Sequence, residues 1–168
     1  ALTLGDMTWD LYWYSNAYDL YSYIQTMNSS VSGLQIFHTI GNHDHDMRES
    51  GDVDTVNAFK RTVAPTYYSF NIGDVHYIVL DNILCTNVSS TDGSGRDYKS
   101  SLTKEQVDWL RKDLSYVDKS KTLVITMHAQ MYAESGDAQM ALSDDLEELC
   151  KGYQTHVMSA HTHVVWNN

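Results

Sequence analysis

Each of four apolar segments in this sequence runs, at its carboxyl end, into residues whose side chains can bind a metal ion. The segments and the residues that follow them are 1–4 with Asp6, 34–40 with Asn42 and His43, 121–127 with His128, and 155–160 with His161 and His163. Short apolar runs of this kind are typical of buried strands. The carboxyl ends of strands form the ligand-binding edge of open α/β sheets. This pattern therefore constrains both the fold and the place of a site.

The segments between these strands carry apolar residues at intervals of three and four, which is typical of one buried helix face. The first stripe consists of Trp13, Ala17, Leu20, Ile24 and Met27. The second consists of Val107, Leu110, Leu114 and Val117, in a helix that begins at Thr103 with Gln106 completing a capping box. We expect two shorter helices, at residues 52–63 and from a capping Ser143 to Cys150.

Residues 66–82, TYYSFNIGDVHYIVLDN, predict a β-hairpin, because Gly73-Asp74 at its centre suits a two-residue turn. The polar segment 86–101 is expected to be a surface loop. Asp81 and Asn82 close the hairpin segment, where a structural role competes with a role in supporting the site. Strands that alternate with helices indicate an α/β fold, and the hairpin adds the antiparallel pairing of an α+β fold.

Composition excludes several classes of protein. The formal net charge is −11 and no Lys/Arg cluster is present, whereas nucleic-acid-binding proteins usually show a basic stripe. No apolar run approaches the ~20 residues that a membrane-spanning helix needs. Cys85 and Cys150 form no metal-binding motif, and the sequence leaves open whether they pair.

The residue types at the predicted sheet edge form a coherent ligand set. Oxygen and imidazole ligands suit Mn, Fe, Zn or Mg, and the absence of thiolates argues against a structural zinc site. A carboxylate can bridge two cations ~3.5–4 Å apart, and such cations attract phosphate and lower the pKa of a bound water. A metal-dependent peptidase could use similar ligands, but the sequence lacks a His-Glu-x-x-His helix.

The motifs Gly5-Asp6, GNHD at 41–44, the strand-terminal His128 and AHTH at 160–163 resemble the motif series of the calcineurin-like metallophosphoesterases. The resemblance implies mixed β-sheets in a sandwich flanked by helices. It also implies hydrolysis of a phosphomonoester or phosphodiester by a metal-bound hydroxide at a dinuclear centre. The substrate would be a small-molecule, lipid or sugar phosphoester.

Roles for individual residues follow from the same resemblance. Asp6 would bridge the two metals, Asn42, His128 and His161 would complete the shell of one, and His163 would bind the other. His43 would contact the scissile phosphate, as an electrostatic stabiliser or as general acid to the leaving oxygen. Catalysis would thus rest on His43 and Asp6, and substrate binding on Asn42 and His43. His45 and Asp46 lie outside the motif and are expected in a solvated loop, with contact to the substrate or to the metal ligands as the alternative.

The sequence departs from the family pattern before its first motif. The family series begins with an Asp-x-His pair upstream of the GD motif, which residues 1–168 do not contain. We therefore expect two divalent cations in the intact protein but a second site that is half formed here. Residues 1–168 would be a single, partial catalytic domain, incomplete at both ends and in contact with an upstream or downstream segment. The alternative is a binding or scaffold module without turnover.

The many Tyr and Trp residues and the segment NVSSTDGSG resemble large exported bacterial members of the same phosphoesterase group. This resemblance favours a periplasmic or exported bacterial location.

Overall fold

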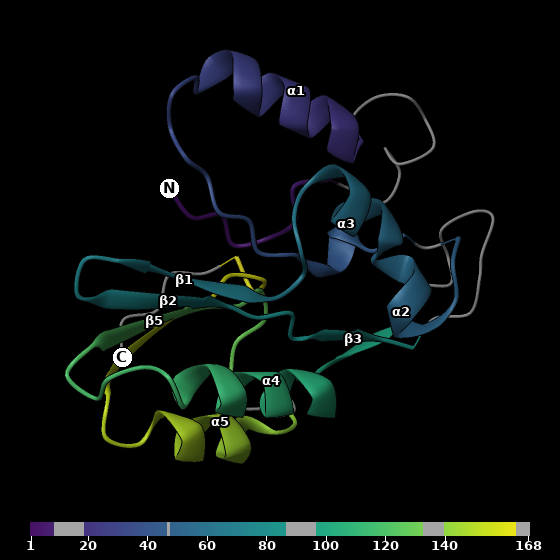
Figure 1. The fold of residues 1–168 in the computed structure, drawn as a ribbon. Helices are drawn as coiled ribbons and strands as arrows, with labels where there is room; N and C mark the ends of the chain where they lie inside the picture. Colours follow the sequence, from purple (N-terminus) through teal and green to yellow (C-terminus); the bar gives the residue numbers. More distant parts are fainter. Residues whose placement is uncertain (9–18, 47, 87–96, 133–139, 164–168) are drawn as a thin grey trace.

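The computed structural model describes residues 1–8, 19–46, 48–86, 97–132 and 140–163 (Figure 1). Its helices are α1 (Leu20–Ser30), the short 3-10 turn η2 (Asn42–Asp44), α2 (Gly51–Thr55), α3 (Asn57–Thr62), α4 (Lys104–Leu114) and α5 (Ser143–Cys150). Its strands are β1 (Tyr68–Ile72), β2 (Val75–Val79), β3 (Ile83–Cys85), β4 (Tyr98–Ser100), β5 (Thr122–Thr126) and β6 (Gln154–Met158).

Four strands form a mixed sheet in the order β1-β2-β5-β6. The last three are parallel to one another, with Tyr77 beside Val124 and Val124 beside His156, while β1 is antiparallel to β2. Ile72 pairs with Val75 across Gly73-Asp74, so the predicted hairpin and its two-residue turn are confirmed. Gly73 has a φ of +58°, which glycine adopts without strain. The mixed α/β class predicted from the sequence is therefore confirmed.

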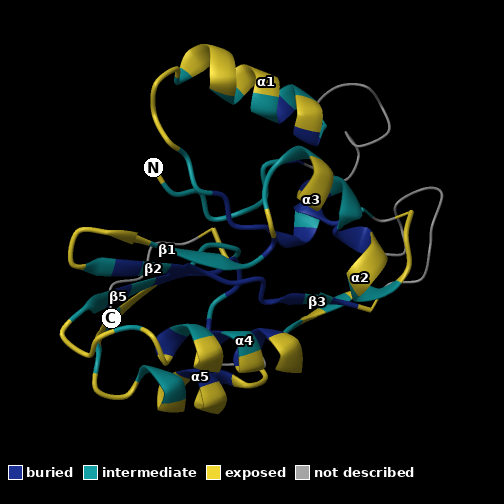
Figure 2. Ribbon diagram, viewed as in Figure 1, coloured by how far each residue is buried: buried dark blue, intermediate teal, exposed yellow. Residues whose placement is uncertain are grey.

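Helices α4 and α5 cover one face of this sheet, below it in Figure 1. Alternate strand residues, Ile78 of β2 with Leu123 and Ile125 of β5, are buried against Leu110 of α4 and Leu146 of α5. Figure 2 shows this buried layer in dark blue along β2 and β5. The amphipathic stripe of α4 thus packs as its three- and four-residue spacing predicts.

Helices α1 and α3 lie on the other side of the sheet, where they share a second core of Leu20, Ile40, Val56 and Phe59. Segments 1–4 and 34–40, predicted as strands, pair in parallel around an isolated bridge between Leu2 and Phe37 and form no regular strand. Phe37 exchanges backbone hydrogen bonds with Ala1 and Thr3, and the amino group of Ala1 donates to the carbonyl of Gln35. The carbonyl of His38 accepts a hydrogen bond from the Tyr68 hydroxyl at 3.0 Å, so its partner is a side chain.

The predicted helix over residues 52–63 is two helices, α2 and α3. The N–H of Asp46 donates to the carbonyl of Thr55 at 2.8 Å, so this carbonyl is occupied where a continuous helix would need it. Segment 98–100, predicted as part of a surface loop, is instead β4, which pairs antiparallel with β3 to form a second, two-stranded sheet.

Helix starts also differ in detail. Ser143 is the first residue of α5 rather than its cap, which is Leu142 at a φ of +64°. Thr103 caps α4 as predicted, since its hydroxyl accepts from the N–H of Gln106, but the Gln106 side chain bonds elsewhere. α1 begins at Leu20 after a capping Asp19, and Trp13 and Ala17 of the predicted stripe lie outside the described residues.

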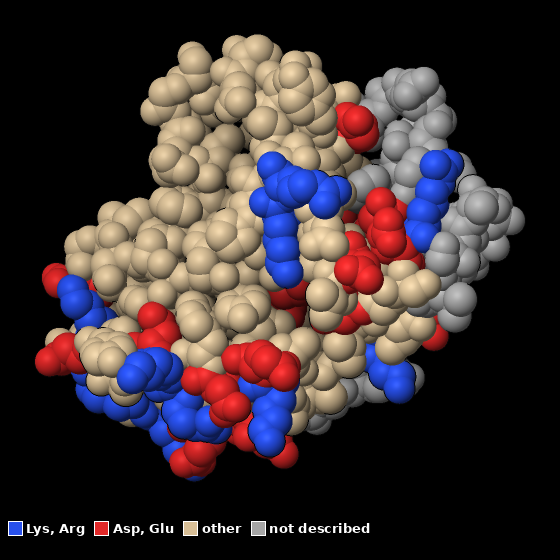
Figure 3. Space-filling view, turned by 45° about the vertical axis from the view of Figure 1, so that its right-hand side comes forward, with Lys and Arg blue, Asp and Glu red and all other residues tan. Residues whose placement is uncertain are grey.

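The described surface carries its charges unevenly. On the face drawn in Figure 3, Lys and Arg side chains are interspersed with Asp and Glu in the lower part, where α4 and α5 lie, while α1 has no charged residue. Within the described parts of the chain, no helix is both long and apolar enough to cross a membrane.

Candidate metal centre

Four of the five predicted ligands converge on one point beyond the carboxyl ends of β5 and β6. His128 Nε2 lies 2.9 Å from Asn42 Oδ1 and 3.1 Å from Asp6 Oδ2. His161 Nδ1 lies 3.0 Å from Asn42 Oδ1 and 3.2 Å from His128 Nε2. The parallel pairing of β5 with β6 brings the two histidines to the same edge.

The tautomer of His128 leaves a lone pair pointing into this cluster. Its Nδ1–H donates to the carbonyl of Leu4 at 2.6 Å, so in the neutral imidazole Nε2 carries the lone pair and faces Asp6 and Asn42. A metal-binding histidine typically donates its other ring N–H to a carbonyl in this way. Asp6 Oδ2, Asn42 Oδ1 and His128 Nε2 are then all electron-pair donors, and their close approach needs a positive charge among them.

Burial and mutual contact shift the pKa values of these groups. Burial opposes ionisation of Asp6, but hydrogen bonds from His128 and from the N–H of His43 hold its pKa below the usual value. Burial likewise opposes the charged form of His128, yet Asp6 raises the pKa of this imidazole above its ordinary value. Burial and the neighbouring His128 lower the pKa of His161. A proton on His128 can thus stand in for a cation.

The spacing of the ligand atoms fits a divalent cation. Bonds of about 2.0–2.2 Å from Zn or a similar ion to nitrogen and oxygen place neighbouring ligand atoms about 2.8–3.6 Å apart. The measured separations of 2.9, 3.0, 3.1 and 3.2 Å lie within that range. One ligand atom each from Asp6, His128 and His161 lie within 4.8 Å of one another, the arrangement expected of a metal site.

The GD and GNHD motifs interlock through their carboxylates. Buried Asp44 accepts the backbone N–H groups of Asp6, Met7, Thr8 and Gly41 at 2.8, 2.8, 3.1 and 2.8 Å. In return, Asp6 Oδ1 accepts the N–H of His43 at 3.0 Å. Asp6 has a φ of +56°, so these bonds hold a ligand in a backbone conformation that it rarely adopts.

Close approach of the two motifs also requires their glycines. A Cβ on Gly5 would lie 2.6 Å from His128 Nδ1 and 2.8 Å from the Cα of Gly41. Asp44 was not predicted as a site residue, although it is the fourth letter of GNHD. Burial raises the pKa of Asp44 to about 6, against the N–H bonds that lower it.

His43 and His163 lie at the margin of the cluster. His43 follows Asn42 in η2 and is half-buried, and its carbonyl accepts the Thr8 hydroxyl at 3.0 Å. His163 is exposed, at a φ of +57°, and does not belong to the group formed by Asp6, His128 and His161.

Sequence reasoning missed Tyr98 as a neighbour of the cluster and misplaced His45. The Tyr98 hydroxyl of β4 lies 3.5 Å from His161 Nε2, on the side of the ring away from Asn42. His45, predicted to be solvated, is buried, with its Nδ1 3.1 Å from both Thr55 Oγ1 and Cys85 Sγ. That prediction was wrong because α2 and β3 pack against the residue, which local sequence does not reveal.

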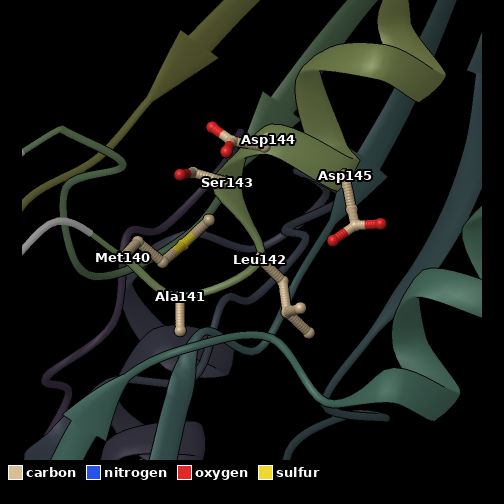
Figure 4. Close-up of a pocket in the computed structure, with 6 residues that line it drawn as sticks. All are labelled: Met140, Ala141, Leu142, Ser143, Asp144 and Asp145. Atoms are coloured by element: carbon tan, nitrogen blue, oxygen red, sulfur yellow. The ribbon is translucent and has the colours of Figure 1, made fainter.

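A pocket of about 440 Å³ lies at the start of α5, lined by Met140, Ala141, Leu142, Ser143, Asp144 and Asp145. Figure 4 shows these side chains around the first turn of the helix. None of them is a predicted ligand.

A family profile and two curated proteins match more than half of this chain. The sequence profile of a family described as calcineurin-like phosphoesterase matches residues 1–165. Purple acid phosphatase 15 of Arabidopsis thaliana is 32% identical over 104 residues, which cover 58% of this chain and 17% of that protein. Purple acid phosphatase 23 of the same plant is 30% identical over 138 residues, 73% of this chain and 27% of that protein. The chain thus spans well under a third of the length of either relative.

Proposed function

The chain belongs to the calcineurin-like phosphoesterase family, and on that premise we propose that the intact protein hydrolyses a phosphoric ester with two divalent cations. The observation that carries the proposal is the convergence of Asp6, Asn42, His128 and His161, whose ligand atoms lie 2.9–3.2 Å apart. Nitrogen and oxygen donors of this kind suit Mn, Fe, Zn or Mg.

Asp6, Asn42, His128 and His161 would hold the first cation. Asp6 and His163 would contribute to holding the second. Bound cations supply Lewis acidity, which polarises the phosphate and lowers the pKa of a coordinated water. Asn42 contributes an oxygen without adding negative charge, so the site stays attractive to a phosphate anion.

His43 acts on the substrate rather than on the metal. Its backbone is fixed at both ends, because its N–H donates to Asp6 and its carbonyl accepts from Thr8. The side chain is half-buried and follows the ligand Asn42 directly. It therefore contacts the scissile phosphate and either stabilises charge there or gives a proton to the leaving oxygen.

The test compares two substitutions in the purified protein, with p-nitrophenyl phosphate as monoester and bis-p-nitrophenyl phosphate as diester. His128→Ala should lower Mn²⁺ content and turnover together, because it removes a ligand. His43→Ala should keep its metal and lose turnover by about 10²–10⁴-fold, the usual scale for a positioned acid or base. Full turnover of His43→Ala would refute its role, and metal binding without any hydrolysis by the wild type would favour the scaffold module instead.

Comparison of turnover with the monoester and with the diester shows which ester the protein prefers. The bacterial periplasmic or exported location and the assignment of residues 1–168 to a single domain stay predictions.

A further inference from the structure

The residue that follows His128 is held by a side chain from a distant part of the chain. Asn82 Nδ2 donates to the carbonyl of Ala129 at 2.7 Å, and Asn82 Oδ1 accepts the N–H of Ala129 at 2.9 Å. Asn82 is fully buried and Ala129 is 1% exposed. One carboxamide thus satisfies both backbone groups of Ala129, as a neighbouring strand would do.

The hydrogen bonds between Asn82 and Ala129 begin where the backbone pairing between β2 and β5 ends. The N–H of Leu80 still donates to the carbonyl of Thr126 at 2.9 Å, which is the last backbone bond between the β2 and β5 segments. On the other side of β5, the N–H of Ala160 donates to the carbonyl of His128 at 2.9 Å. Beyond Thr126, the side chain of Asn82 therefore replaces β2 as the partner of the segment that carries His128.

A second carboxamide fixes the backbone next to Asn82. Gln106 Oε1 accepts the N–H of Asp81 at 3.0 Å, and Gln106 Nε2 donates to the carbonyl of Asp81 at 2.7 Å. Gln106 is buried in the first turn of α4. Helix α4 thus holds Asp81, and the next residue, Asn82, holds Ala129 beside His128. We call Gln106 and Asn82 the amide pair.

We propose that Asn82 is a positioning residue for His128, supported by Gln106 through Asp81. The proposal rests on the proposed function, because it treats His128 as a metal ligand. A ligand must be held within about 0.5 Å of its productive place, and His128 lies just past the end of the regular sheet. The amide pair supplies the rigidity that the sheet no longer provides there.

The metal-free protein is titrated with Co²⁺, which gives the Co²⁺ affinity and the visible spectrum of the bound ion. The free energy of unfolding of each variant is measured in urea. Asn82→Ala should bind Co²⁺ about 10–100-fold more weakly, the range for residues that orient metal ligands, and should show an altered spectrum. Gln106→Met keeps helix α4 and a side chain of similar volume but loses both hydrogen bonds to Asp81. It should therefore also weaken Co²⁺ binding, by a smaller factor than Asn82→Ala does.

Two controls separate positioning from general destabilisation. Leu110→Ala weakens the same α4 core without touching the amide pair, so it should unfold more easily yet bind Co²⁺ as the wild type does. His128→Ala should abolish binding at this centre. If Asn82→Ala does not fold, Gln106→Met carries the comparison.

The outcomes are distinguishable. Wild-type affinity and spectrum in Asn82→Ala and Gln106→Met, with binding lost in His128→Ala, would overturn the positioning role and leave the proposed function intact. Equal weakening in Leu110→Ala would reduce the role of the amide pair to stability and likewise overturn the proposal. Undiminished binding in His128→Ala would overturn the metal centre itself.

Discussion

Substituting Gly41 by alanine tests whether the interlock of the GD and GNHD motifs builds the metal centre. Gly41 has a φ of −114°, which alanine adopts without strain, so only space is at issue. An added Cβ would lie 3.0 Å from the Cγ of Asp6 and would overlap its Oδ1 and its backbone N. To reach an ordinary contact of about 3.5 Å, the Asp6 loop must retreat from the turn by roughly 1 Å.

That displacement would move Asp6, a proposed metal ligand, and would stretch two of the hydrogen bonds that hold it. The N–H of Asp6 lies 2.8 Å from Asp44 Oδ2, and the N–H of His43 lies 3.0 Å from Asp6 Oδ1. An extra 1 Å takes both beyond hydrogen-bond range. Overpacking of this kind should cost about 1–3 kcal/mol of unfolding free energy. A misplacement of about 1 Å should also lower turnover by roughly 10²-fold.

The assay is a titration of the metal-free protein with Mn²⁺, followed by urea unfolding of the same sample. We expect the Mn²⁺ affinity of Gly41→Ala to fall at least tenfold, with Gly33→Ala as the matched control. Gly33 has a φ of +85° and nothing within 4 Å of an added Cβ, so its substitution should cost about 1–2 kcal/mol in strain without affecting Mn²⁺ binding. Wild-type affinity in Gly41→Ala would refute the reasoning.

Three further substitutions test the packing around the site. Leu110→Ala should lower the free energy of unfolding by about 2–5 kcal/mol, because the side chain is fully buried against the sheet; urea unfolding measures it, and a loss below about 1 kcal/mol would contradict the packing. His76→Ala should cost about 2–3 kcal/mol, since buried His76 Nε2 lies 2.8 Å from Asp113 Oδ2, whereas the exposed His156→Ala should cost little; equal losses would disprove this contact's role. Burial lowers the pKa of His38, so its contribution to stability is present above about pH 6.5 and lost as the pH falls through the lowered value. His38→Gln should therefore flatten the fall of unfolding free energy between about pH 7 and pH 5, and an unchanged slope would count against it.

Local sequence predicted the elements whose pattern is short and regular. The hairpin follows from Gly73-Asp74 between two alternating strands, and α4 from its apolar spacing and the Thr103 cap. Segments whose backbone partners lie far away were harder to predict. Residues 34–40 have the composition of a strand, but they pair with residues 1–4 only around the bridge between Leu2 and Phe37. The helix over residues 52–63 divides because Asp46 occupies the carbonyl of Thr55.

The candidate site divides in the same way. Asp6, Asn42, His128 and His161 could be named from the sequence because each follows an apolar segment. Only His128 and His161 follow strands of the four-stranded sheet, β5 and β6, whose ends meet at one edge. His45 and Asn82 could not be assigned, since their burial depends on contacts with residues 40 and 47 positions away in the chain.

The sequence by itself determined which residue types follow the apolar segments, and hence the family and the chemistry open to the site. Only the tertiary structure decided that Asp6 Oδ2 lies 3.1 Å from His128 Nε2, that Asp44 holds the Asp6 loop, and that Asn82 continues the sheet beside His128. The physical reason is the distance along the sequence over which each effect acts. Periodicity and turn chemistry act over a few neighbouring residues, whereas buried polar groups must find partners wherever packing places them.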